Sequence, residues 1–154
     1  MVMPAPGAWK TRDDMLKAVA AEAPRGQVPR AYLNEQNYWA LVGVDGGGSR
    51  SGLMSEDGAV EAGLGGFSIE PTLRIAGEAS LNWANVEMRH SLREGYLPMP
   101  SVFWQHPLAD LRVEAAADGP PKAPRLLVRY TVTAPPGQPL KGQLVLGLRP
   151  WQVN

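Results

Sequence analysis

The sequence predicts a mostly β fold, an antiparallel β-sandwich with one short N-terminal helix, and three observations predict it. Towards the C-terminus, apolar and polar residues alternate with the period of two that strands require, most clearly over residues 126–132 and 144–148. The chain holds 17 Gly and 15 Pro among 154 residues, which implies many turns and few long helices. Hydrophobic residues make up 44% and charged residues 19%, the balance of a globular chain.

One segment near the N-terminus has a helical pattern. Thr11 can cap a helix, and Asp14 follows it at the spacing of a capping box. Apolar residues then recur at helical spacing until Pro24 and Gly26 end the pattern. We therefore expect a lead of residues 1–35 with a short helix at about residues 11–23, followed by a sandwich domain of residues 36–154.

The expected strands follow one another at short spacing. Residues 38–44 are apolar on both faces, which is typical of a buried strand. Pro71 indicates an edge strand or a bulge in segment 67–75, and residues 81–92 are expected to be extended with a bulge near Ala84. Short connections favour antiparallel neighbours, and strands with one apolar face stack as two layers. The other expected strands are residues 50–55, 59–62, 102–105, 111–115, 126–132 and 144–148.

Charge and cysteine content narrow the classes of partner. Lys+Arg and Asp+Glu are both 15, so the net charge is zero, which argues against nucleic acid and leaves self-association plausible. The chain has no Cys, so disulfides and thiolate chemistry are excluded. We expect no membrane partner, because no apolar run is long enough to span a bilayer, and residues 1–8 do not resemble a signal peptide. The sequence leaves the localisation unknown.

The sequence predicts no catalytic residue, no metal site and no cofactor. The two histidines, His90 and His106, lack the spacing of a metal motif, and the glycine-rich residues 46–52 lead into a strand pattern rather than a phosphate-binding helix. There is no GxSxG nucleophile motif. Glycosidase chemistry needs two converging carboxyl groups, and solvated strand faces explain the acids equally well. The candidate acids are Glu70, Glu87, Glu94 and Asp110.

Aromatic residues are the feature that points most directly to a ligand. The chain has five tryptophans, at positions 9, 39, 83, 104 and 151, and flat aromatic rings stack on the apolar faces of sugars. Core packing is the alternative for each ring, and we assign Trp39 to the core. Trp83, Tyr96 and Trp104 flank the loop of residues 93–100, so with Glu94 they are the candidate carbohydrate-binding residues.

Several segments resemble one family of proteins. They are residues 65–71 (GGFSIEP), 83–87 (WANVE), 94–98 (EGYLP) and 149–154 (RPWQVN), together with the alternation over 111–148. Over roughly residues 36–154 the chain resembles the β-sandwich region of large bacterial proteins with discoidin-type domains. Those proteins look related to glycoside hydrolases and phosphorylases with an α/α-toroid, in which a super-sandwich similar to galactose mutarotase precedes the toroid.

The resemblance implies a non-catalytic module of a carbohydrate-active protein, with a structural or substrate-framing role and the catalytic carboxylates on the toroid. A full super-sandwich is much longer than this chain, and the sequence stops on an apolar segment, so we expect either a fragment of a longer protein or a chain that uses its terminus in an interface. The implied partners are a toroid domain, a second copy of the chain, or a carbohydrate. Two alternatives stay open: a self-standing carbohydrate-binding module that uses exposed aromatic rings, and a small sugar-modifying enzyme such as an epimerase with a Glu or His base.

Overall fold

The computed structural model describes residues 11–78 and 80–149. The described chain divides into two compact units, a helical unit of residues 11–37 and a sandwich unit of residues 38–149. Of the five tryptophans, Trp9 and Trp151 lie outside the described residues, as does the segment 150–154 that contributed to the family resemblance.

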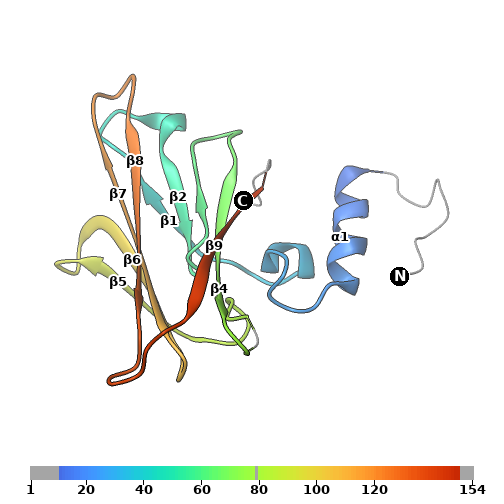
Figure 1. Ribbon diagram of the computed structural model, residues 1–154. Helices are drawn as coiled ribbons and strands as arrows, with labels where there is room; N and C mark the ends of the chain where they lie inside the picture. Colours follow the sequence, from blue (N-terminus) through green and yellow to red (C-terminus); the bar gives the residue numbers. More distant parts are fainter. Residues whose placement is uncertain (1–10, 79, 150–154) are drawn as a thin grey trace. The chain divides into compact units, whose positions relative to one another are not determined.

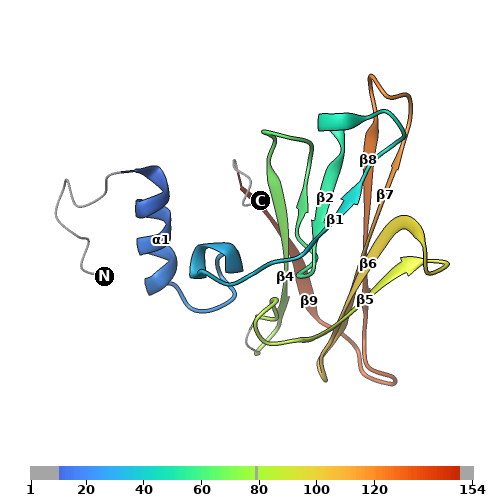
Figure 2. The same ribbon diagram turned by 180° about the vertical axis from the view of Figure 1, so that it is seen from behind.

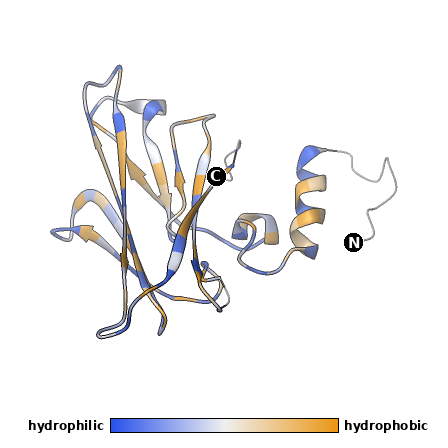
Figure 3. Cartoon of the chain, in the orientation of Figure 1, coloured by the Kyte–Doolittle hydropathy of each residue, from blue (hydrophilic) through white to orange (hydrophobic). Residues whose placement is uncertain are grey.

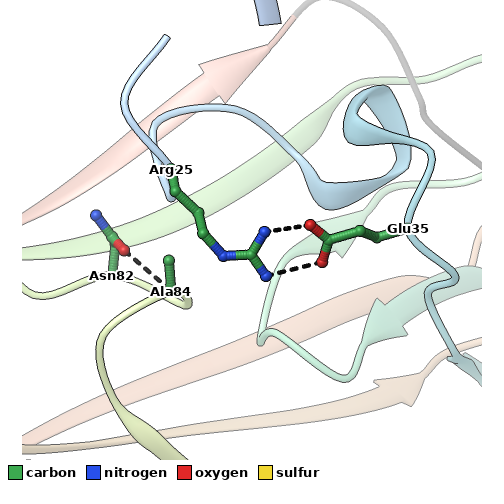
Figure 4. A network of polar contacts seen from close by, with 4 residues as sticks. All are labelled: Arg25, Glu35, Asn82 and Ala84. Carbon is green, nitrogen blue, oxygen red and sulfur yellow. Dashed lines mark hydrogen bonds and ion pairs between the residues drawn. The ribbon is translucent and has the colours of Figure 1, made fainter. Parts of the chain in front are cut away.

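The helical unit contains one α-helix and one short 3₁₀ turn. Helix α1 (Arg12–Glu22) begins at the predicted capping box, in which Thr11 and Asp14 each accept a hydrogen bond from the other's backbone N–H. Figure 3 shows hydrophilic residues in its first turn and hydrophobic residues further along. After the 3₁₀ turn η1 (Arg30–Leu33), Glu35 forms a bidentate ion pair with Arg25 (Figure 4). This pair closes the connection that follows α1.

The sandwich unit confirms the predicted fold class, because its strands form two antiparallel sheets (Figures 1 and 2). The first sheet has the strand order β1-β2-β3-β4-β9, and the second has β5-β6-β7-β8. The chain therefore passes to the second sheet after β4 and returns at its end to place β9 beside β4. The first-sheet strands are β1 (Trp39–Val42), β2 (Gly52–Ser55), β3 (Val60–Glu61), β4 (Ser68–Ile75) and β9 (Gly142–Arg149). The second-sheet strands are β5 (Glu87–Arg93), β6 (Leu97–Gln105), β7 (Asp110–Asp118) and β8 (Arg125–Thr133).

The core lies between the inner faces of the two sheets. Alternate residues of each strand point inwards, and Figure 3 shows hydrophobic and hydrophilic residues interleaved along the strands. The first sheet contributes a set of buried apolar residues that includes Val42, Met54, Val60 and Leu73. The second sheet contributes a set that includes Val102, Trp104, Leu111, Val113 and Ala115.

Trp104 joins the two sheets by a hydrogen bond as well as by packing. Its indole Nε1–H donates to the backbone carbonyl of Asp57, in the turn between β2 and β3, over 3.1 Å. Gly58, in the same turn, has φ +84° and lies close to Val113 and Trp104. A residue with a Cβ would be strained at this φ, so glycine fits the turn over the second sheet.

Two predicted details of the strands are wrong. Residues 82–86 form a turn rather than a strand: Asn82 accepts a hydrogen bond from the Ala84 N–H over 3.0 Å (Figure 4), and the bulge of this region lies between Leu92 and Arg93 instead. Pro71 lies in an inner strand, β4, and pairs with Leu146 of β9. The proline is tolerated because β3 pairs only with Ser68 and Ile69 of β4, so no residue of β3 lies opposite Pro71.

The hydroxyl group of Tyr130, on β8, is buried within the sandwich. Its oxygen has no hydrogen-bond partner among the described residues. Burial raises the pKa of the Tyr130 phenol to about 12, because the charged phenolate would be less well solvated than the neutral form.

We expect Gly52→Ala to destabilise the sandwich, because a Cβ at Gly52 would lie 2.7 Å from Leu126 Cδ2 and 2.8 Å from the Glu61 carbonyl oxygen. Overpacking of this kind costs about 1–3 kcal/mol. Gly147→Ala is the matched control, since its nearest contact would be an ordinary 3.6 Å. Urea denaturation measures both variants, and equal midpoints would show that the close approach at Gly52 is not a constraint.

Candidate functional site

An open slot between the two sheets is the first candidate site. It has a volume of about 560 Å³ and lies where β1, an edge strand of the first sheet, faces β5 and β6. Tyr38, immediately before β1, stands at the slot with 63% of its surface exposed. The other lining residues include Trp39, Ala40, Met54, Glu56, His90, Leu92, Pro100 and Val102.

His90 links the two sheets across this slot. Its Nε2 lies 2.7 Å from the backbone carbonyl oxygen of Glu56, which can only accept a hydrogen bond. Nε2 therefore carries the proton and donates it to this carbonyl oxygen. In the neutral ring, Nδ1 has no proton and can accept a hydrogen bond. The slot thus combines an exposed phenol ring and an imidazole with an apolar wall and with Glu56 in its lining, a combination suited to a polyhydroxylated ligand.

A second cleft lies on the face of the second sheet that points away from the core. This outer cleft has a volume of about 710 Å³. Glu114 stands on its floor and forms ion pairs with Arg112 at 3.3 Å and Arg129 at 2.9 Å. Side chains that line the outer cleft include Ser91, Arg93, Glu94, Met99, Ser101, Arg112, Glu114, Leu127 and Arg129.

The structure separates the four candidate carbohydrate-binding residues. Trp104 is 1% exposed and Trp83 is buried in the turn before β5, so neither ring can stack on a sugar, and these two assignments are corrected to core residues. Tyr96 is 71% exposed on the turn between β5 and β6. Glu94 is exposed on the same turn, has φ +55° and lines the outer cleft.

The candidate acids do not converge on one point. Glu70 lies on β4 of the first sheet, where its carboxylate accepts a hydrogen bond from Arg149 over 2.7 Å. Glu87 and Asp110 lie on the second sheet with β6 between their strands, and Glu94 follows the opposite end of β5 from Glu87. The four acids are therefore spread over both sheets and both ends of β5 rather than gathered at one site.

Burial dominates the electrostatics of Glu70. Loss of solvation raises the pKa of its carboxyl group above the ordinary 4.5, and the Arg149 hydrogen bond opposes this rise without cancelling it. For the Glu70 carboxylate, the cost of losing solvation therefore exceeds the attraction to the Arg149 guanidinium.

The histidines and the glycine-rich segment have local structural contacts. His106 lies away from the slot, and its Nδ1 accepts a hydrogen bond from the Leu108 N–H over 3.2 Å. Residues 46–51 form a turn that contains a 3₁₀ segment, η2 (Gly48–Arg50), and β2 begins at Gly52. No group of three or more His, Cys, Asp or Glu side chains that could hold a metal ion occurs in the described part of the chain.

Sequence reasoning missed the slot because it treated residues 38–44 as buried on both faces. Tyr38 and Leu41 are exposed, since β1 lies at the edge of its sheet. A Tyr-Trp pair immediately before an apolar run was the available signal, but it does not reveal which strand is at an edge. His90 was considered only as a metal ligand or a base.

Comparisons with known proteins do not add a family. No protein-family model, no curated protein and no solved structure matches the chain. Within residues 11–78 and 80–149, no helix has the length and apolar character needed to cross a membrane.

We expect Glu70→Gln to reduce the loss of stability as pH rises above about 4.5. In the wild type the unfolded chain releases this proton at a lower pH than the folded chain, so stability falls as pH rises from the ordinary pKa to the raised one and is level above it. Urea midpoints across this range test the effect. Asp118→Asn is a control of opposite sign, because the Arg125 hydrogen bond lowers the Asp118 pKa. A Glu70→Gln profile parallel to the wild type would contradict the assignment.

Proposed function

We propose that the sandwich is a non-catalytic carbohydrate-binding module that holds a sugar chain in the inter-sheet slot and frames it for chemistry performed by another domain. The single observation that carries this proposal is the exposed ring of Tyr38 at the slot, beside the polar groups of His90 and Glu56. Aromatic rings stack on the apolar faces of sugars, and the imidazole can bind a hydroxyl group.

The positions of the candidate acids favour binding over hydrolysis. Retaining and inverting glycosidases need two carboxyl groups on either side of one bond, whereas Glu70, Glu87, Glu94 and Asp110 are spread over two sheets, and none of the four lines the slot. The epimerase alternative is best supported at His90, which lines the slot, rather than at His106, which lies away from it. Turnover of sugars by the chain, lost on His90→Gln, would favour that enzyme over a binding module.

We expect Tyr38→Ala to weaken binding of a neutral oligosaccharide by about fivefold, because stacking on an exposed ring contributes on the order of 1 kcal/mol. Calorimetry with cello-, xylo- and manno-oligosaccharides measures the affinity. Tyr96→Ala is the matched control, since this exposed tyrosine does not line the slot.

The outcomes of this experiment distinguish the slot from the turn between β5 and β6. Loss on Tyr38→Ala with normal binding by Tyr96→Ala supports the slot. The reverse result would place the ligand at the turn between β5 and β6, where the sequence predicted Tyr96 and Glu94, and would contradict the slot. Unchanged binding in both variants would exclude both tyrosines.

Assembly through β9 is a second candidate function, and the exposure of this edge strand favours it. Leu148 is 67% exposed and Leu146 is also exposed. Strand β9 contains no Pro, no Asp or Glu, and one cation, Arg149, which pairs with Glu70. Edge strands are usually protected by charges or bulges, as β5 is by Arg89 and its bulge. We infer that a second copy pairs there, because antiparallel pairing centred on Leu146 places leucine opposite leucine.

We expect Leu146→Lys to shift the chain from dimer to monomer in sedimentation velocity, because a charge on the exposed edge opposes strand pairing. Leu64→Lys is the control, since Leu64 is exposed in a turn outside β9. A wild-type chain that is monomeric at high concentration would exclude self-pairing and leave a different domain, such as a toroid, as the partner to test.

A further inference from the structure

The outer cleft crosses all four strands of the second sheet. By the register of the sheet, Ser91 of β5, Ser101 of β6, Glu114 of β7 and Arg129 of β8 lie side by side in one row. Paired residues of an antiparallel sheet point to the same face, so this row stands on the outer face, opposite the core. Arg93 lines the same cleft from the β5 side.

The cleft presents more hydrogen-bond donors than its own acids can use. Its charged lining consists of Arg93, Arg112 and Arg129 against Glu94 and Glu114, three cations to two anions in a chain with no net charge. One carboxylate, Glu114, is shared by two guanidinium groups, each with five N–H donors. Arg93 makes no ion pair within the described residues, so its guanidinium is available to an anion.

The positions of the arginines favour an elongated ligand. Arg93 is on β5 and Arg129 on β8, and three inter-strand spacings of about 4.8 Å separate these strands by about 14 Å. An extended chain with repeated anionic groups can pair with each arginine above its own strand. Between them, Met99 and the exposed side chain of Leu127 add apolar surface to the lining. A chain with repeated negative charge and apolar ring faces matches this pattern.

We propose that the outer cleft is a second binding site, separate from the slot, for an acidic polysaccharide whose carboxylate or sulfate groups pair with Arg93 and Arg129. The saccharide nature of the ligand rests on the proposed function, whereas its negative charge and length rest on the cleft itself. Planar guanidinium groups bind carboxylates and sulfates in a bidentate manner, which favours arginine for this role.

Calorimetry of the whole chain with an oligogalacturonate tests the proposal. We expect binding that weakens as salt is raised, and a loss of about tenfold for Arg93→Gln and for Arg129→Gln, because each removes a charge-assisted hydrogen bond. Glu114→Gln is expected to tighten binding, because it removes an anion that competes with the ligand for Arg112 and Arg129. If Glu114 had a purely structural role, this substitution would not tighten binding. Arg74→Gln, an exposed arginine of the first sheet, is the control.

Further probes decide the chemical class of the ligand. Dextran sulfate in place of oligogalacturonate distinguishes sulfate from carboxylate as the recognised group. Polyglutamate that binds as tightly as oligogalacturonate would overturn the saccharide assignment, and oligogalacturonate binding unchanged in both arginine variants would overturn the site. A neutral oligosaccharide that binds through Tyr38 while oligogalacturonate does not bind would leave the proposed function standing and refute this inference alone.

Discussion

The hydrogen bond from Trp104 to the Asp57 carbonyl is the contact on which the arrangement of the two sheets depends. Trp104 is buried on β6, and its only donor is satisfied by the turn between β2 and β3. Ser55 stabilises this turn, since its hydroxyl oxygen accepts hydrogen bonds from the N–H groups of Asp57 and Ala59. The turn also carries Glu56, whose carbonyl binds His90, so the same contact positions one wall of the slot.

The alternation of side chains explains why the fold class could be predicted. Along β7, Leu111 and Val113 are buried while Arg112 and Glu114 are on the outer face, and β8 repeats this pattern. A shift of one residue would bury the charges, so the register is strongly constrained. The same alternation already contained the outer cleft, but the sequence did not show that these residues lie in one row with Ser91 of β5.

The candidate aromatic residues were harder to predict, because a ring's exposure depends on strand order rather than on its neighbours in sequence. Trp104 and Tyr38 both stand in or beside aromatic, apolar segments. Trp104 lies on an inner strand, whereas Tyr38 precedes an edge strand. Strand β1 is at an edge because β9, the last strand of the chain, pairs with β4 at the other end of the sheet. The turn at Asn82 was missed for a related reason: side-chain hydrogen bonds to the backbone override an extended pattern.

Successive residues of β5 serve opposite sides of one hairpin. His90 lines the slot, whereas Arg93 lines the outer cleft, and Ser91 and Leu92 border both. The slot is bounded by apolar side chains with a few polar groups and no Lys or Arg, whereas the lining of the outer cleft includes three arginines and two glutamates. A ligand favoured on one side therefore gains little from the other, because an anion would lose solvation in the slot without a cation to pair with. The β5–β6 hairpin therefore presents an apolar site and an arginine-containing site on its two sides.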